Sequence, residues 1–115
     1  MDLTEKKCVP CEGGVPRLTP DQIPPFAAAV PAWTVKEDRQ LERRFTFADF
    51  LAAMDFVNRM ADLAEAEAHH PDFAVQYSLV NVTIWTHAIG GLSENDFILA
   101  AKIDRLAEQL LASPA

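Results

Sequence analysis

Two long segments of the chain repeat hydrophobic residues at alternating steps of three and four, the period of an amphipathic helix. The first covers residues 47–68, and the second begins near Ser93. Each opens on a capping-box pattern with an acidic third position, Thr46-x-x-Asp49 and Ser93-x-x-Asp96. We predict two buried stripes: Phe50, Met54, Val57, Ala61 and Ala64, widened by Phe47, Leu51 and Met60, and then Leu99, Ile103, Leu106 and Leu110.

Four shorter segments alternate hydrophobic and polar residues, which is the period of a strand with one buried face. They cover residues 33–37, 41–47, 73–77 and 80–87. The first two flank a short polar turn and are typical of an antiparallel hairpin. In the last segment we expect Val80, Val82 and Ile84 to face the helices, and Asn81, Thr83, Trp85 and His87 to lie on the opposite face.

Residues 1–17 show no hydrophobic period and are rich in proline and glycine, so we predict an irregular N-terminal arm. The arm contains Cys8-x-x-Cys11. A closed zinc site needs four ligands, and this segment offers two. An ordinary pair of thiols is the simpler interpretation, and a metal shared between subunits or a redox role are the alternatives. A short helix should follow, capped by Thr19 and Gln22.

These elements predict an α+β fold: a four-stranded antiparallel sheet with helices packed on one face. The chain has 115 residues, half of them hydrophobic, which fits one domain with a small core. No repeat or linker divides it. We therefore place the domain at residues 18–112, after the arm.

The charge balance excludes some functions. The formal net charge is −7 and the pI is near 4.8, so we expect neither direct nucleic-acid binding nor adhesion to an anionic membrane. There is no apolar run of 18 residues and no apolar leader at the start, which predicts no membrane span and no signal peptide. We expect a cytoplasmic protein with reduced cysteines.

All three histidines lie between Glu65 and Asp96. Histidine can give or take a proton near neutral pH. On the predicted helix, Glu65 and His69 share a face, and the carboxylate and the helix end should both favour protonated His69. Pro71 should end the helix at His69 or His70. With His87 at a strand end, these imidazoles could converge on one pocket.

The pattern Glu65-x3-His69-His70-Pro71-x5-Tyr77-x9-His87-x8-Asp96 resembles the signature of the pterin-4a-carbinolamine dehydratases. The flanks are also similar to that family: Leu18-Thr19, Trp33, Phe45-x-Phe47 and Gly91-Leu92-Ser93-Glu94. The resemblance covers roughly residues 18–110. It implies the α+β architecture described above and association as a homodimer or homotetramer.

The resemblance also implies a reaction, the dehydration of a 4a-hydroxytetrahydropterin without a metal or another cofactor. We expect His69 to act as the acid, His87 to take or relay the other proton, and His70 to position the pterin. The alternative is that two of the histidines exchange roles for the two stereoisomers at C4a. Further candidates for substrate binding or tuning are Glu65, Phe73, Tyr77, Thr86 and Asp96. Asp96 has an alternative role as a helix cap alone. Three positions depart from the family. Phe73 stands where members often carry tryptophan, Ala68 where some carry an acidic residue, and Trp85 where the residue is often small.

The sequence allows more than one function. The enzyme would recycle the pterin of an aromatic amino acid hydroxylase, or serve another pterin pathway such as the molybdenum cofactor. Animal members of the family also act as dimerisation partners of a homeobox transcription factor, so a non-catalytic pterin-binding or coactivator-like module is the alternative. An interaction protein has no physical need to keep all three histidines, which favours the enzyme.

Overall fold

The computed structural model describes residues 2–9 and 15–112. Three α-helices, four strands and two short 3₁₀ helices follow one another along these residues. In chain order they are η1 (Leu3–Glu5), α1 (Ile23–Ala29), β1 (Thr34–Lys36), β2 (Gln40–Thr46), α2 (Phe50–Glu67), β3 (Asp72–Gln76), β4 (Leu79–Ile84), η2 (His87–Ile89) and α3 (Glu94–Ala112).

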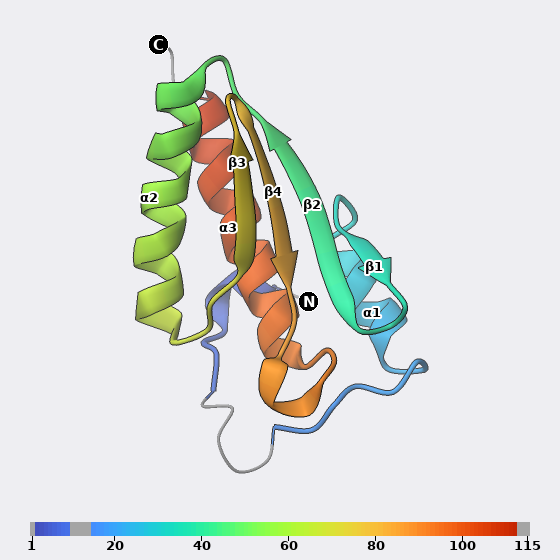
Figure 1. The fold of residues 1–115 in the computed structure, drawn as a ribbon. Helices are drawn as coiled ribbons and strands as arrows, with labels where there is room; N and C mark the ends of the chain where they lie inside the picture. Colours follow the sequence, from blue (N-terminus) through green and yellow to red (C-terminus); the bar gives the residue numbers. More distant parts are fainter. Residues whose placement is uncertain (1, 10–14, 113–115) are drawn as a thin grey trace.

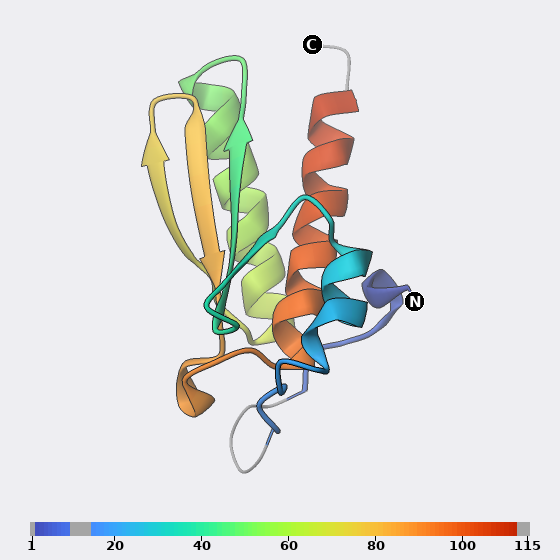
Figure 2. The same cartoon turned by 90° about the vertical axis from the view of Figure 1, so that its right-hand side faces the viewer.

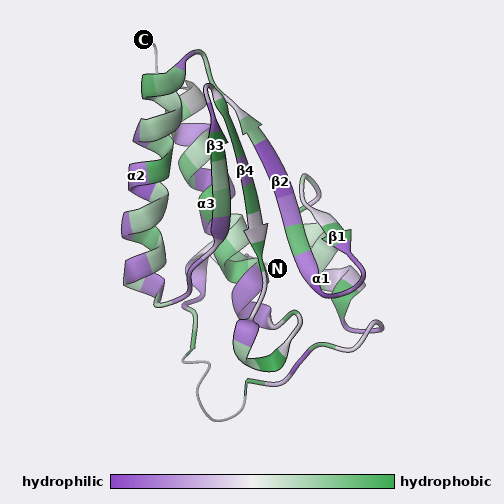
Figure 3. Cartoon of the chain, viewed as in Figure 1, coloured by the Kyte–Doolittle hydropathy of each residue, from purple (hydrophilic) through white to green (hydrophobic). Residues whose placement is uncertain are grey.

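The four strands form one antiparallel sheet in the order β1-β2-β4-β3. All three α-helices lie on one side of it, and the other side is open (Figure 1, Figure 2). The predicted α+β architecture is therefore confirmed. The alternation of hydrophilic and hydrophobic residues is visible along β2 (Figure 3), where Leu41 and Phe45 turn inward and are buried.

The core fills the space between the sheet and the helices. Val80, Val82 and Ile84 are buried on the helix side of β4, as their spacing predicts. Aromatic rings close the core at the level of α2. Phe56 packs against Phe45 with ring centroids 4.8 Å apart, and against a second phenylalanine from the loop after β2 at 5.0 Å.

The buried stripe of α2 agrees only in part with the predicted one, since Val57, Met60 and Ala64 are buried as predicted. Phe50 and Leu51 are 47% and 77% exposed, whereas Ala53 and Phe56 are fully buried. Both stripes satisfy the helical spacing, and packing against the sheet selects the one in which Phe56 contacts the Phe45 ring of β2. The full buried set is Ala53, Phe56, Val57, Met60, Ala64 and Glu67.

Three predicted boundaries are also wrong. Asp49, not Thr46, caps α2, since its carboxylate accepts the Ala52 backbone N–H at 2.8 Å. Helix α1 begins at Ile23, after a turn over residues 20–22. The predicted capping contact of Gln22 is nevertheless present, since its side chain accepts the Thr19 N–H at 2.9 Å. Strand β3 ends before Tyr77, which has a φ of +54° and starts the tight turn into β4.

Candidate active site

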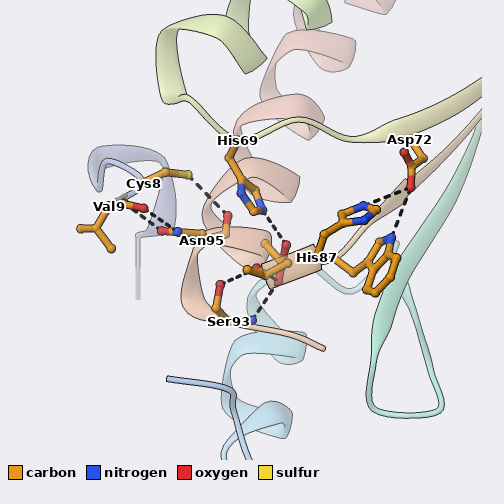
Figure 4. A network of polar contacts seen from close by, with 10 residues as sticks. Cys8, Val9, His69, Asp72, His87, Ser93 and Asn95 are labelled. Atoms are coloured by element: carbon orange, nitrogen blue, oxygen red, sulfur yellow. Dashed lines mark hydrogen bonds and ion pairs between the residues drawn. The ribbon is translucent and has the colours of Figure 1, made fainter. Parts of the chain in front are cut away.

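Five segments meet at the end of the sheet opposite the β3–β4 turn (Figure 1). They are the C-terminus of α2, the start of β3, the end of β4, η2 and the N-terminus of α3. His69 and His70 lie in the connection from α2 to β3, and His87 opens η2; Figure 4 shows His69 and His87. Each histidine also lies close to a carboxylate of another residue, and the three pairs have different burial.

His69 is held in the interior by the way α2 ends. The helix stops at Glu67, earlier than predicted, because Ala68 adopts a left-handed conformation with φ of +54°. The next residue therefore leaves the helix axis and enters the protein. His69 is only 6% exposed, and its Nε2 lies 2.6 Å from Oδ1 of Asp96. The predicted pairing with Glu65 is wrong, since that pairing requires His69 to continue the helix.

Asp96 connects the histidine to two other buried groups. Its Oδ2 accepts hydrogen bonds from the Ser93 backbone N–H and the Thr86 hydroxyl, each at 2.8 Å. The bond from Ser93 is the predicted capping interaction of α3. The side chain of Asp96 is fully buried. Asp96 therefore caps the helix and contacts His69 at the same time, so it does not serve as a helix cap alone.

Thr86 is fixed by the loop that follows β4. Its backbone N–H donates to the carbonyl of Gly91 at 2.9 Å, which closes the loop containing η2. Gly90 ends η2 with a φ of +62°, a conformation that glycine adopts without strain. The hydroxyl of Thr86 also lies 2.8 Å from that of Ser93. This closed loop carries His87 beside the start of α3.

His70 lies on the surface at the start of the extended segment before β3. Its Nε2 is 2.5 Å from Oε2 of Glu65, and the two side chains are 62% and 77% exposed. The carboxylate expected to tune His69 therefore pairs with His70. A pair this exposed contributes little to stability, because water screens it. Its effect is to restrain the His70 ring at the rim of the site.

His87 is also accessible, with 59% of its side chain exposed. It opens η2 rather than ending β4, which stops at Ile84. Its ring packs on that of Trp85 with centroids 3.9 Å apart. Oδ2 of Asp72 lies 3.5 Å from Nε2 of His87 and accepts the indole N–H of Trp85 at 3.2 Å (Figure 4). Trp85 and Asp72 thus orient the third histidine.

All three histidines line one hollow of about 210 Å³. Its other lining residues are Ala68, Trp85, Thr86 and Ala88. A second hollow of about 230 Å³ adjoins it through His70 and has apolar walls that include Met60, Pro71 and Phe73. Of the other residues predicted for the site, Phe73 and Glu65 line this second hollow. Tyr77 lies in the β3–β4 turn, 69% exposed, and lines neither hollow.

Asp72 is the functional candidate that sequence reasoning missed. It follows directly on Pro71 inside the stretch that holds the histidines, and an acidic residue there is the signal that could have been used. Its pairing with His87 depends on β3 lying beside β4, with Asp72 opposite Thr83. His87 is 15 positions further along the chain, so local spacing does not predict that Asp72 pairs with it.

The arm offers no reactive thiol at Cys8. Cys8 is buried, and burial together with the nearby Glu67 raises the pKa of its thiol to about 12. Cys11 lies outside the described residues. Across residues 2–9 and 15–112, no group of three or more metal-binding side chains comes together. In the same part of the chain, no helix is both long and apolar enough to cross a membrane.

Comparison with known proteins agrees with this geometry. The family model described as Pterin 4 alpha carbinolamine dehydratase matches residues 16–106. A relative from Rubrobacter xylanophilus is 47% identical over 105 residues, which cover 91% of this chain and 98% of the relative. One from Halorhodospira halophila is 50% identical over 107 residues, 92% and 98% of the two chains. Both are provisionally named pterin-4-alpha-carbinolamine dehydratases.

Two solved structures share the fold. A transcriptional coactivator/pterin dehydratase from Brucella melitensis aligns with a TM-score of 0.75 and 33% identity, over 80% of this chain and 99% of that one. A pterin dehydratase-like protein, a RuBisCO assembly factor in the alpha-carboxysome, aligns with a TM-score of 0.58 and 27% identity, over 66% and 89%. The match of the family model and these relatives together show that this chain belongs to the pterin 4 alpha carbinolamine dehydratase family.

Proposed function

We propose that this protein is a hydro-lyase that dehydrates a 4a-hydroxytetrahydropterin to a quinonoid dihydropterin and water. The observation that carries the proposal is the single hollow lined by His69, His70 and His87. Each of these imidazoles has its own carboxylate partner. Membership of the family supports the same reaction. The activity would reside in residues 18–112.

The reaction needs one proton delivered and one removed. The bond between C4a and its hydroxyl oxygen breaks, and the oxygen leaves as water after it takes up a proton. The proton on N5 is lost, and its electron pair forms the new double bond to C4a. Hydroxide is a poor leaving group at neutral pH, so a general acid at the oxygen and a base near N5 each accelerate the step, typically by about 10²–10⁴-fold.

We assign the acid to His69. Its Nε2–H donates to the buried Asp96 carboxylate, which fixes the ring and stabilises the imidazolium that forms when His69 carries a second proton. The sequence pointed to Glu65 for this task, and Asp96 takes its place. In this assignment His87 takes or relays the N5 proton, since it is exposed at the rim and oriented by Asp72.

The remaining residues bind and orient the pterin. His70 borders both hollows and can donate a hydrogen bond to a pterin heteroatom. The apolar walls near Pro71 and Phe73 offer a surface for a flat ring. No step in this scheme requires a metal or a second cofactor. We also propose a homodimer or homotetramer in the cytoplasm, with the product returned to an aromatic amino acid hydroxylase.

The decisive experiment generates the 4a-hydroxytetrahydropterin in place with an aromatic amino acid hydroxylase. Its decay is followed by ultraviolet absorbance, with and without the protein. We expect a rate above the spontaneous one that is proportional to protein concentration. A folded protein that leaves the spontaneous rate unchanged contradicts the proposal.

The second candidate is a non-catalytic module of the same fold. Two observations favour it: one solved relative is titled a transcriptional coactivator as well as a dehydratase, and the other is a RuBisCO assembly factor. Such a module would act through its surface. It would keep its partner binding when the histidines are replaced, whereas the dehydratase would lose its activity.

A further inference from the structure

A buried ion pair lies directly behind the site and has no part in the proposed chemistry. Glu67 is the last residue of α2, and its Oε2 lies 2.9 Å from Nζ of Lys102 on α3. The two side chains are only 9% and 17% exposed. Burial opposes ionisation of Glu67, but hydrogen bonds from the Cys8 backbone N–H and from Lys102 outweigh it and lower the pKa of Glu67.

The N-terminal arm joins this pair. The backbone N–H of Cys8 donates to Oε1 of Glu67 at 2.9 Å, so both carboxylate oxygens of Glu67 have partners. The next residue, Val9, exchanges two hydrogen bonds with the side-chain amide of Asn95, at 2.9 and 2.8 Å (Figure 4). The thiol of Cys8 also donates to the Asn95 carbonyl at 3.5 Å. Cys8 and Val9 of the arm are thereby fixed to the end of α2 and to the start of α3.

These contacts lie next to the most buried pair of the site. Glu67 precedes His69 by two residues, and Asn95 directly precedes Asp96. Between Glu67 and His69 the chain reverses at the left-handed Ala68. The position of His69 relative to Asp96 therefore depends on how firmly the end of α2 is held against α3.

We propose that Glu67 is a positioning residue for the active site. With Lys102 and the arm, it holds the end of α2 against the N-terminus of α3, so that His69 and Asp96 meet at 2.6 Å. The predicted effect on turnover rests on the dehydratase function proposed above. The predicted effect on the bond between His69 and Asp96 does not.

Stability alone does not account for this pair. Taking two charges out of water is unfavourable, so a buried ion pair often adds little net stability compared with apolar residues of similar size. The pair instead fixes the orientation of Glu67, because its carboxylate accepts from two specified donors at once. A displacement of about 1 Å at a catalytic group can cost about 100-fold in rate, so this directional hold bears on catalysis.

The test uses Glu67→Gln, Lys102→Met and the double variant in the full chain, with Lys6→Met as the matched control. Glu67→Gln can keep the bond from Cys8 but turns an amide NH₂ toward the Lys102 ammonium. The double variant removes both charges. Lys6 belongs to the same arm and pairs with Glu94 at 2.5 Å, but that pair is exposed.

Two readouts are taken at a temperature where all variants are folded. The first is kcat and KM for the dehydration. The second is the NMR resonance of the His69 ring N–H, which a short bond to a buried carboxylate shifts downfield and protects from exchange. We expect Glu67→Gln to lower kcat by about 10- to 100-fold with little change in KM. The reason is that a displaced His69 weakens proton donation in the transition state but not binding of the substrate.

The same variant should also lose the protected N–H signal. The double variant should recover part of both readouts, and Lys6→Met should match the wild type. Unchanged kcat and an unchanged N–H signal in folded Glu67→Gln would overturn the inference and leave Glu67 a purely structural residue. If Glu67→Gln does not fold, Lys102→Met decides by the same two criteria. If the wild type itself lacks activity, the proposed function fails and the NMR signal alone decides this inference.

Discussion

Asp96→Asn should separate the orienting role of Asp96 from its role in the fold. The substitution keeps the shape of the side chain but replaces one acceptor oxygen with an NH₂ donor. In the wild type, Oδ2 accepts from the Ser93 N–H and the Thr86 hydroxyl, and Oδ1 accepts from His69. The amide oxygen should stay toward Ser93 and Thr86, because the flipped amide would place its NH₂ group against two donors. The NH₂ group then faces Nε2 of His69.

His69 must respond by moving its ring proton. Nε2 can meet an NH₂ donor only as an acceptor, so the neutral ring changes to the Nδ1–H tautomer. The variant also loses the negative charge that stabilises an imidazolium. The hydrogen bond between His69 and a charged, buried carboxylate becomes a neutral one, which costs about 1 kcal/mol of unfolding free energy. For comparison, the wrong tautomer in a serine protease lowers kcat by about 10⁴-fold.

We therefore expect kcat of Asp96→Asn to fall by at least about 100-fold, within the usual range for losing one acid–base group. The assay combines dehydration kinetics, urea unfolding and ¹⁵N NMR of the imidazole. Glu94→Gln is the matched control, since it makes the same chemical change in the first turn of α3 at a residue whose side chain is 40% exposed. If Asp96→Asn keeps kcat within a factor of two and His69 keeps its tautomer, our assignment of Asp96 is refuted.

Three further predictions concern neighbouring positions. Asp72→Asn should lower kcat by about 3- to 10-fold, less than Asp96→Asn does, because His87 keeps its packing on Trp85. Its unfolding free energy in urea should stay within about 0.5 kcal/mol of the wild-type value. An unchanged kcat would show that Asp72 has no role in the site. Ala68→Gly should raise the unfolding free energy by about 1 kcal/mol, since Ala68 is exposed and left-handed, and a lower urea midpoint would contradict this. The folded Cys8 thiol has a pKa raised from 9.0 to about 12, so its stabilising effect is present below pH 9 and lost as the pH rises toward 12. The stability advantage of wild type over Cys8→Ala should accordingly shrink by up to about 1.4 kcal/mol per pH unit in that window, and a constant difference would argue against it.

The sequence predicts the sheet better than it predicts the orientation of α2. The alternation through Val80, Val82 and Ile84 leaves only one face to bury, because a strand has just two faces. Helix α2 carries apolar residues on more than one side, and helical spacing alone does not select among them. The fully buried Ala53 and the 77% exposed Leu51 show that packing against β2 makes the choice.

The site shows the same limit. The three histidines and Asp96 are predicted from the pattern that resembles the family signature, but their partners are not. Local spacing on a helix joins Glu65 to His69, whereas the chain leaves the helix at Ala68 and pairs His69 with Asp96, 27 residues further on. That pairing is set by the packing of α2 and α3, and it changes which carboxylate supports the proposed acid.

Comparing turnover in three proteins shows whether the histidines of this hollow carry out a dehydration. Wild type, His69→Ala and His87→Ala are assayed on hydroxylase-generated 4a-hydroxytetrahydropterin, after circular dichroism shows that each is folded. We predict that wild type exceeds the spontaneous rate and that each variant loses at least about 100-fold of the catalysed rate. Variants that stay folded and as active as wild type, or a wild type no faster than the spontaneous reaction, would contradict the proposed function.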